Sequence, residues 1–208
     1  MKPICFLLAA SAALFFLLAG CSSEKPAPKP AAEAKPEAAP VQTVRVKFET
    51  SKGDFIVEVH PEWAPIGAKR FLDLVKDGYY TNARFFRVLP NYIAQFGLAA
   101  QPAMTRKWNR RIEDDPVVRT NAYGTLTFAT AGPNARTAQL FINIRSNQVL
   151  DSQGFAPFAK VVEGMSVTEK FYSGYGEAPD QELITRRGNA YLSSQFPRLD
   201  FIKQATVL

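Results

Sequence analysis

The sequence predicts a single mainly β domain that follows a non-globular N-terminal region. Gly and Pro are frequent, with 12 and 15 among 208 residues, and the apolar runs between them are short. Short apolar runs bounded by turn residues are typical of strands in an all-β or mostly β domain. Once the N-terminal region is set aside, about 165 residues remain, which is enough for one domain with one core. We therefore expect residues 43–208 to fold as one unit.

The first 20 residues have the pattern of a secretory signal. Lys2 precedes an apolar run from Ile4 to Leu18, and small residues follow. This run is too short and too poorly flanked to indicate a membrane span. Its end, Leu18-Ala-Gly-Cys21, resembles the bacterial lipobox, which implies cleavage before Cys21 and lipidation of that residue. The alternatives are an ordinary signal with a chance cysteine, or an uncleaved anchor.

Residues 21–42 consist mainly of Ala, Pro, Lys and Glu, and Val41 is their only large apolar residue. Such a segment cannot bury a core, so it is predicted to be a disordered tether with polyproline character. At about 3.1 Å per residue, it would hold the domain at most ~65 Å from the lipid. Ser22 stands where an inner-membrane retention signal would usually place Asp. By analogy with bacterial lipoproteins, we expect a lipid anchor in the cell envelope, at the outer membrane and facing the periplasm.

The first elements of the domain follow from simple periodicities. Apolar and polar residues alternate over 44–50 and again over 55–59, which predicts a hairpin with its apolar faces toward a core. In residues 64–75 the apolar side chains have helical spacing, a Pro lies near the start, and Gly78 is a suitable stop. This pattern predicts a helix.

Residues 84–97 are dense in β-branched and aromatic residues, and Pro90-Asn91 interrupts them. This composition predicts strand, tight turn, strand. Because side chains alternate along a strand, residues at every second position should share a face. These sets are Phe85, Arg87 and Leu89 before the turn, and Ile93 and Gln95 after it. An Arg in so apolar a run needs a partner, and Gln95 is the nearest polar side chain.

The rest of the chain is less regular. Residues 98–121 are expected to form a long loop, and the charge cluster from Arg106 to Asp115 within it is interpreted as solvated rather than as a nucleic-acid patch. Strands are expected at 124–128, 140–144 and 158–162, with a turn-rich link at 149–155. Helices are expected at about 166–172 and 188–196, before a last apolar segment at 199–208.

Several kinds of chemistry are disfavoured by what the domain lacks. The two cysteines, Cys5 and Cys21, both precede the predicted domain, so it has no disulfide or cysteine metal site. His60 is the only histidine and stands in a turn-like stretch, so a catalytic triad or a histidine zinc site would have to rely on it alone. We expect no metal and no cofactor.

Two blocks of sequence resemble the signature of the cyclophilins, whose strand pair reads roughly F-H-R-x-x-P-x-F-x-x-Q-G. Phe85, Arg87, Pro90 and Gln95 match it, Tyr92 is an aromatic variant, and Phe86 departs from the usual His. The second block, residues 126–134 followed by 138–142, resembles L-S-M-A-x-A-G-P-x-x-x-x-S-Q-F-F-I. The resemblance covers about residues 44–208.

The resemblance implies a closed eight-stranded antiparallel barrel capped by two helices. It also implies peptidyl-prolyl cis–trans isomerase activity, with Arg87 as hydrogen-bond donor and Gln95 orienting it. A substrate-binding face would combine an apolar slot, backbone groups of Ala129 and Thr130 for an extended peptide, and Gln139. The full set of substrate-binding residues is Tyr92, Ile93, Ala129, Thr130, Gln139, Phe141, Leu150 and Phe155. From the residues alone, the apolar members would be interpreted as ordinary core.

Three functional readings remain open at this point. The first is an isomerase that assists the folding of exported proteins, binds proline-containing polypeptides, and is monomeric with no nucleic-acid partner. The second is a chaperone or scaffold that holds such peptides without significant turnover. The third is a lipid carrier, which would need an open apolar interior, whereas bulky candidates such as Phe86, Phe96 and Phe128 favour a filled barrel. Arg87 and Gln95 together favour the isomerase.

Overall fold

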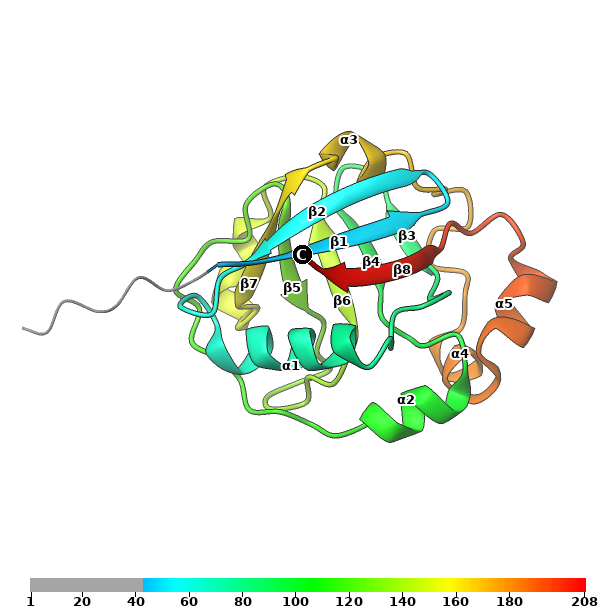
Figure 1. The fold of residues 1–208 in the computed structure, drawn as a ribbon, viewed down its shortest axis with the longest axis horizontal. Helices are drawn as coiled ribbons and strands as arrows, with labels where there is room; N and C mark the ends of the chain where they lie inside the picture. The colour runs from blue at the N-terminus through cyan, green and yellow to red at the C-terminus, as the bar shows by residue number, and fades with distance from the viewer. Residues whose placement is uncertain (1–42) are drawn as a thin grey trace, which may run out of the picture. The chain divides into compact units, whose positions relative to one another are not determined.

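The computed structural model describes residues 43–208. The predicted signal peptide, the lipidation site at Cys21 and the predicted tether lie outside the described residues. One eight-stranded antiparallel sheet organises the domain (Figure 1), in the order β3-β4-β6-β5-β7-β2-β1-β8. The strands are β1 (Val44–Thr50), β2 (Gly53–Val59), β3 (Arg87–Leu89), β4 (Ile93–Phe96), β5 (Thr125–Phe128), β6 (Leu140–Asn143), β7 (Pro157–Glu163) and β8 (Ile202–Val207).

The hairpin of β1 and β2 confirms the expected alternation. Residues Val46, Phe48, Phe55 and Val57 are buried, and Phe48 pairs with Phe55 across the strands. Their rings stack with centroids 4.8 Å apart. Since side chains on one face of a strand recur every second residue, the alternation alone was enough to place these residues in the core.

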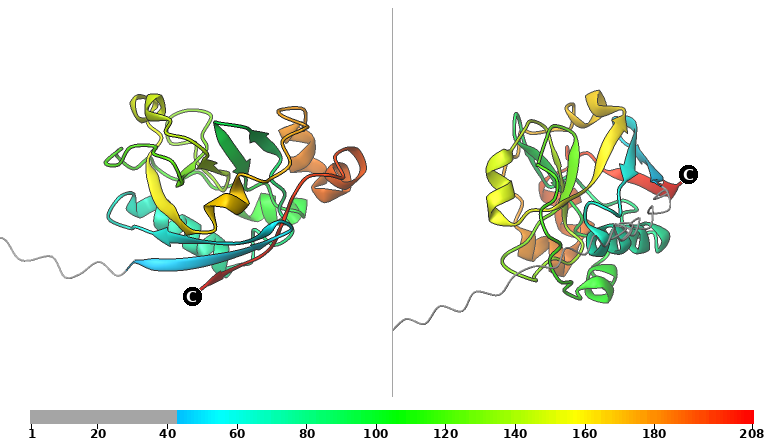
Figure 2. Two further views of the ribbon diagram at one scale, coloured as in Figure 1. Left: turned by 90° about the horizontal axis from the view of Figure 1, so that it is seen from above. Right: turned by 90° about the vertical axis from the view of Figure 1, so that its left-hand side faces the viewer.

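The sheet curls but stays open between β3 and β8 (Figure 2), so the prediction of a closed barrel was wrong. The segment just before β3 contacts the start of β8: an isolated bridge joins Arg84 to Phe201, and the Phe85 N–H donates to the Asp200 carbonyl at 3.0 Å. The Asn82 N–H also donates to the Ile202 carbonyl at 2.7 Å, and the Ile202 N–H donates to the Ala83 carbonyl at 2.9 Å. The physical reason is that Phe85 and Val88 are three positions apart and yet both are buried in the same apolar core, which the strict alternation of a strand does not allow. The backbone therefore departs from regular strand geometry between them, and regular pairing with β8 does not continue into β3.

Aromatic side chains fill the interior of the curled sheet. Phe96 and Phe128 belong to this core, as expected, and α1 (Pro65–Lys76) covers it with Phe71 and Leu74. The core rings include Phe48, Phe55, Phe71, Tyr80, Phe96, Phe128 and Phe158, each no more than 1% exposed. An interior packed in this way has no room for a lipid. Phe86, by contrast, lies outside this core.

The helices differ from the two that were expected to cap the sheet. The region predicted as a long loop contains α2 (Pro102–Trp108), and the helix predicted at 166–172 is only the short α3 (Met165–Thr168). A 3-10 helix, η1 (Gln148–Gln153), occupies the turn-rich link. After α3, helix α4 (Gln181–Arg187) was not predicted, whereas α5 (Asn189–Gln195) matches the expected short helix. These two helices bury Phe86 in a second apolar cluster together with Leu98, Ile184, Tyr191, Leu192 and Leu199.

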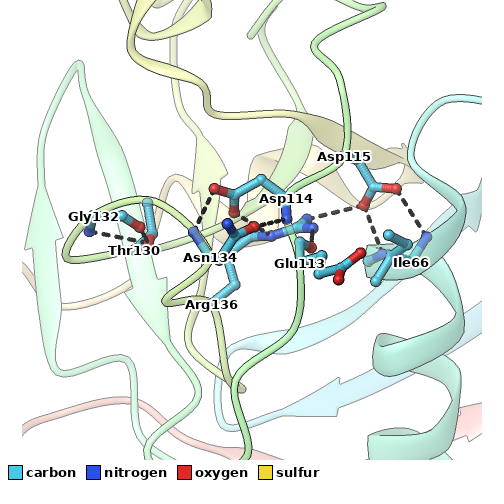
Figure 3. A network of polar contacts seen from close by, with 9 residues as sticks. Ile66, Glu113, Asp114, Asp115, Thr130, Gly132, Asn134 and Arg136 are labelled. Carbon is cyan, nitrogen blue, oxygen red and sulfur yellow. Dashed lines mark hydrogen bonds and ion pairs between the residues drawn. The ribbon is translucent and has the colours of Figure 1, made fainter.

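Arg136 is the centre of a buried charge network that joins three segments (Figure 3). Its Nη1 donates to Asp115 Oδ2 at 3.0 Å, and its Nη2 donates to the Glu113 carbonyl. Its Nε lies 3.0 Å from Asp114 Oδ1 without hydrogen-bond geometry, so this contact is an ion pair only. Asp115 also accepts the Ile66 and Gly67 N–H groups at the start of α1. The interpretation of this acidic stretch as solvated was therefore wrong for Asp115, which is 4% exposed.

The described part of the chain shows neither a long apolar helix nor a metal-ligand cluster. No helix within residues 43–208 is long and apolar enough to cross a membrane. The same residues contain no group of three or more His, Cys, Asp or Glu side chains placed to hold a metal ion. His60 stacks on Trp63 with ring centroids 3.8 Å apart, and its ring nitrogens face Glu58 and Glu62.

Candidate active site

A small apolar slot lies apart from the main core. Its floor consists of Ile93, Phe141 and Leu150, which are 4–6% exposed and form a cluster of their own. The cavity measures about 170 Å³. The structure brings together here nine of the ten residues predicted for the site: Arg87, Tyr92, Ile93, Gln95, Ala129, Thr130, Phe141, Leu150 and Phe155. Their individual roles in catalysis and binding remain predictions.

The β3–β4 hairpin positions the polar edge of this slot. Pro90 presets the turn, and Asn91 follows with a φ of +57°, a left-handed conformation that Asn tolerates better than most residues. The Tyr92 N–H donates to the Leu89 carbonyl at 3.1 Å and closes the turn. In the resulting register, Arg87 is directly opposite Gln95. Because cross-strand partners share a face, the turn places the side chains of Arg87 and Gln95 on the same side of the sheet.

A row of polar side chains runs along this edge. Arg87 Nη1 donates to Gln95 Oε1 at 3.2 Å, and Gln95 Nε2 donates to Gln139 Oε1 at 3.0 Å. Gln139 completes the predicted set but lines the neighbouring hollow rather than the slot itself. At the other end of the row, Arg87 contacts Glu177, which the sequence analysis did not single out. Gln95 therefore contacts Arg87 directly, and its role in orienting Arg87 stays a prediction.

Apolar rings close the slot from the sides. Phe155 packs edge-on against Phe141 with centroids 5.7 Å apart, and Tyr92 is half-buried beside them. The sequence alone favoured core positions for these residues, but they pack on each other and not on the main core. An apolar cavity of this size bordered by a guanidinium suits a small cyclic side chain attached to a polar backbone.

A polar network that sequence reasoning missed holds the floor in place. Asp151 of η1 accepts the Asn121 backbone N–H and side-chain amide at 2.8 and 2.7 Å. Asn147 donates to the Tyr92 carbonyl at 3.0 Å and to Asn143 Oδ1 at 2.7 Å. Burial opposes ionisation of Asp151, but hydrogen bonds from Thr120 and Asn121 outweigh it and keep its pKa below the ordinary value. The charged carboxylate thus fastens η1, and with it Leu150, at neutral pH.

Fewer backbone groups than expected are free to bind a peptide beside the slot. The Ala129 N–H donates to the Gln139 carbonyl at 2.9 Å, so of the two backbone groups of Ala129 only the carbonyl is left for a peptide. The Thr130 hydroxyl closes a tight turn with the Gly132 carbonyl at 2.5 Å (Figure 3). Asn134, at the end of this loop, exchanges backbone and side-chain bonds with Asp114. The Arg136 network therefore supports the loop that borders the slot.

Phe85 does not share the face of Arg87, which corrects the alternation predicted before the turn. Phe85 is fully buried in the main core, where it stacks on Phe171 with centroids 3.8 Å apart. Phe86, the departure from the cyclophilin pattern, lies under α4 and α5. A ring at this position is covered on all sides, which accounts for an apolar residue there.

A curled antiparallel sheet with an arginine at the edge of an apolar surface slot defines a class of β proteins with a site for a small ligand group. The chain belongs to one family of this class, the cyclophilin-type peptidyl-prolyl cis–trans isomerases. The family model described as "Cyclophilin type peptidyl-prolyl cis-trans isomerase/CLD" matches residues 45–186.

Known relatives agree with this assignment. The chain is 34% identical over 139 residues to peptidyl-prolyl cis-trans isomerase B of Escherichia coli, covering 60% of this chain and 82% of that protein. It is 31% identical over 157 residues to peptidyl-prolyl cis-trans isomerase CYP18-2 of Arabidopsis thaliana, covering 72% and 92%. A crystal structure of a cyclophilin-type isomerase of Cryptosporidium parvum shares the fold, with a TM-score of 0.61 at 24% identity over 80% of this chain and 98% of that one.

Proposed function

We propose that the domain catalyses cis–trans isomerisation of X–Pro bonds, with the proline ring in the slot and Arg87 donating to the substrate around the prolyl amide. The observation that carries this proposal is the row Arg87–Gln95–Gln139 beside an apolar cavity of about 170 Å³. Family membership supports it. A second crystal structure of the Cryptosporidium parvum protein was obtained in the presence of the dipeptide Ala-Pro.

The energetic requirement matches what such a site offers. The peptide C–N bond has a rotation barrier of ~18–20 kcal/mol, and X–Pro bonds isomerise in tens to hundreds of seconds. Reaching milliseconds requires a factor of ~10⁴–10⁵, or roughly 6–7 kcal/mol. No covalent bond breaks and no proton leaves the substrate, so neither a nucleophile nor a general base is needed.

Two parts of the site would share this stabilisation. One preorganised donor typically contributes about 3–4 kcal/mol, and guanidinium is a permanent donor with no acceptor role. The apolar slot, formed by Ile93, Phe141 and Leu150, supplies the rest by removing water from the amide and holding the ring while the bond twists. Substrates would be proline-containing polypeptides that lie along the edge at Ala129 and Thr130.

The experiment that tests the proposal is a protease-coupled assay on a short X–Pro peptide with the purified domain, residues 43–208. We expect faster cis-to-trans conversion, unchanged after treatment with EDTA, because the proposed step uses only side chains and the slot. A folded domain that binds the peptide but leaves its conversion at the uncatalysed rate would replace the isomerase proposal with that of a peptide-holding chaperone.

We further propose that the domain acts at the outer membrane, facing the periplasm, on exported proteins. The support is the sequence Leu18-Ala-Gly-Cys21 with Ser22 after it and the Pro-rich stretch that follows. Two or more acyl chains give stable anchoring, at about 0.8 kcal/mol per buried CH₂. The domain would then be a monomer held at the membrane by its N-terminus.

Replacing Cys21 by Ala tests the lipid anchor. We expect the Cys21→Ala precursor to incorporate no labelled fatty acid and to disappear from the outer-membrane fraction, because no thiol remains to be acylated. The Cys5→Ala variant is the control, since Cys5 lies within the predicted signal peptide, and it should keep its label. Label that persists on Cys21→Ala would contradict the anchor proposal.

A further inference from the structure

The contact between Arg87 and Glu177 stands out because it links the proposed catalytic residue to a distant part of the chain. Glu177 Oε1 accepts from Arg87 Nε at 2.6 Å and lies 2.5 Å from Nη2. The carboxylate therefore contacts the edge of the guanidinium formed by Nε and Nη2, while Gln95 accepts a hydrogen bond from Nη1. The fork geometry of guanidinium makes such a two-nitrogen contact directional as well as attractive.

The two contacts leave part of the guanidinium free. Arginine has five N–H donors, one on Nε and two on each terminal nitrogen. Among residues 43–208, Glu177 accepts the Nε N–H and Gln95 accepts one N–H on Nη1, while the contact of Glu177 with Nη2 is an ion pair. One N–H on Nη1 and at least one on Nη2 remain for a substrate. Glu177 is not among the residues that line the slot, so it does not occupy the place of the proline ring.

The segment that carries Glu177 is itself held firmly. Glu177 lies inside a turn closed by the Ala178 N–H, which donates to the Tyr175 carbonyl at 2.9 Å. Tyr175 packs against Phe196 with centroids 5.1 Å apart, and the Asp180 N–H donates to the Tyr191 hydroxyl at 3.2 Å. Both anchors belong to the unit of α4 and α5, which also buries Phe86, the chain neighbour of Arg87.

We propose that Glu177 is a positioning residue for isomerisation, which together with Gln95 fixes the plane of the Arg87 guanidinium beside the slot. This inference rests on the proposed function. Without Glu177, only Nη1 would be held, and the guanidinium could rotate about its long side chain. Fixing a donor in advance is what raises its contribution to a transition state. The unit of α4 and α5 would thus serve the site by holding Glu177 and covering Phe86.

The ion pair contributes little to the stability of the fold. The side chain of Arg87 is 23% exposed and that of Glu177 is 63% exposed, and exposed pairs of this kind are worth little. A substitution of Glu177 should therefore report on Arg87 without unfolding the domain. Glu182 offers a matched control, because it carries the same charge nearby on α4, is 73% exposed, and pairs with Arg186 instead.

The test compares Glu177→Ala, Glu177→Gln and Glu182→Gln with the wild type in the isomerisation assay. A misplacement of about 1 Å can lower a rate by ~10²-fold, and Gln95 still holds Nη1, so we expect kcat to fall about tenfold in Glu177→Ala. Glu177→Gln keeps a neutral acceptor and should lose about threefold, since charged hydrogen bonds are roughly twice as strong as neutral ones. KM and the melting temperature should stay near the wild-type values, and Glu182→Gln should match the wild type.

A second readout does not depend on turnover. The Arg87 Nε–H signal in an NMR spectrum, assigned by its loss in Arg87→Lys, should move and broaden in Glu177→Ala and stay in place in Glu182→Gln. An unchanged signal together with an unchanged kcat would overturn the proposal, and so would a faster Glu177→Ala enzyme, which would make Glu177 a competitor of the substrate. An inactive wild type would refute the proposed isomerase function, while the NMR readout would still decide whether Glu177 positions Arg87.

Discussion

Arg87→Lys should lower the isomerisation rate by about 10²–10³-fold, the loss typical of one preorganised donor. Lysine keeps the charge and most of the stem but loses the planar fork. In the structure that fork is held by Gln95 at 3.2 Å and by Glu177 at 2.6 Å. An ammonium group cannot maintain both contacts and still present two donors toward the slot. If Arg87 acts mainly on the twisted amide, peptide affinity should change little.

The measurement is kcat, peptide affinity and melting temperature on the same preparation. Arg84→Lys is the control, because Arg84 lies three residues upstream, lines no part of the slot, and donates to the Leu199 carbonyl and Ser193. We expect the control to retain activity within about twofold, since its donors lie away from the reacting amide. Activity of Arg87→Lys within twofold of the wild type would remove Arg87 from the mechanism. A collapse of the melting temperature would make it a structural ion partner.

Arg136→Met should have the largest effect on stability, with a loss of about 3–5 kcal/mol. The side chain of Arg136 is 4% exposed and that of Asp115 is 1% exposed. Removing the guanidinium leaves the buried Asp115 carboxylate without a cation, and Met replaces only its volume. The loop at Thr130 and Asn134 would lose its support as well (Figure 3). For a domain of this size we expect the melting temperature to fall by about 6–20 °C.

Two further variants separate charge from packing in this network. Arg136→Met combined with Asp115→Asn should recover part of the loss, because it removes a buried charge that has no partner. Arg45→Met removes an exposed guanidinium, 51% accessible, from its pair with Glu58, and should cost less than about 1 kcal/mol. Chemical denaturation gives all three values. A loss below 1 kcal/mol for Arg136→Met would show that the network is not a main support of the fold.

The parts of the fold that follow local rules were predictable. The alternation in β1 and β2, the spacing of α1 and the Pro90-Asn91 turn each depend on neighbouring residues, and the structure confirms them. Helix α2 was missed although Pro102 at its first position is a start signal. The opening between β3 and β8 was not predictable in this way, because it depends on Phe85 and Val88 both being buried in the main core, at a spacing that breaks the alternation of a strand.

The site was predictable only in part, for a related reason. The apolar residues Ile93, Phe141 and Leu150 look like core by composition, and only the resemblance to the cyclophilins suggested a surface slot. Glu177 lies 90 positions from Arg87 along the chain, in a turn with no motif of its own. Similarly, the sequence around Asp115 indicates only one more charge in a charged loop. Its burial follows from contacts with Arg136 and with the start of α1, which the sequence does not reveal. Such pairings depend on the packing of whole elements.

The most direct test of the central claim is exchange NMR of an Ala-Pro-containing peptide at equilibrium, with the domain added in substoichiometric amount. Without a catalyst, cis and trans forms interconvert in tens to hundreds of seconds, too slowly for exchange peaks on the NMR timescale. The slot and Arg87 predict exchange peaks between the two forms for the wild type, and their near disappearance for Arg87→Lys. Peptide signals that shift on binding while no exchange peaks appear would show a binder without turnover and contradict the account.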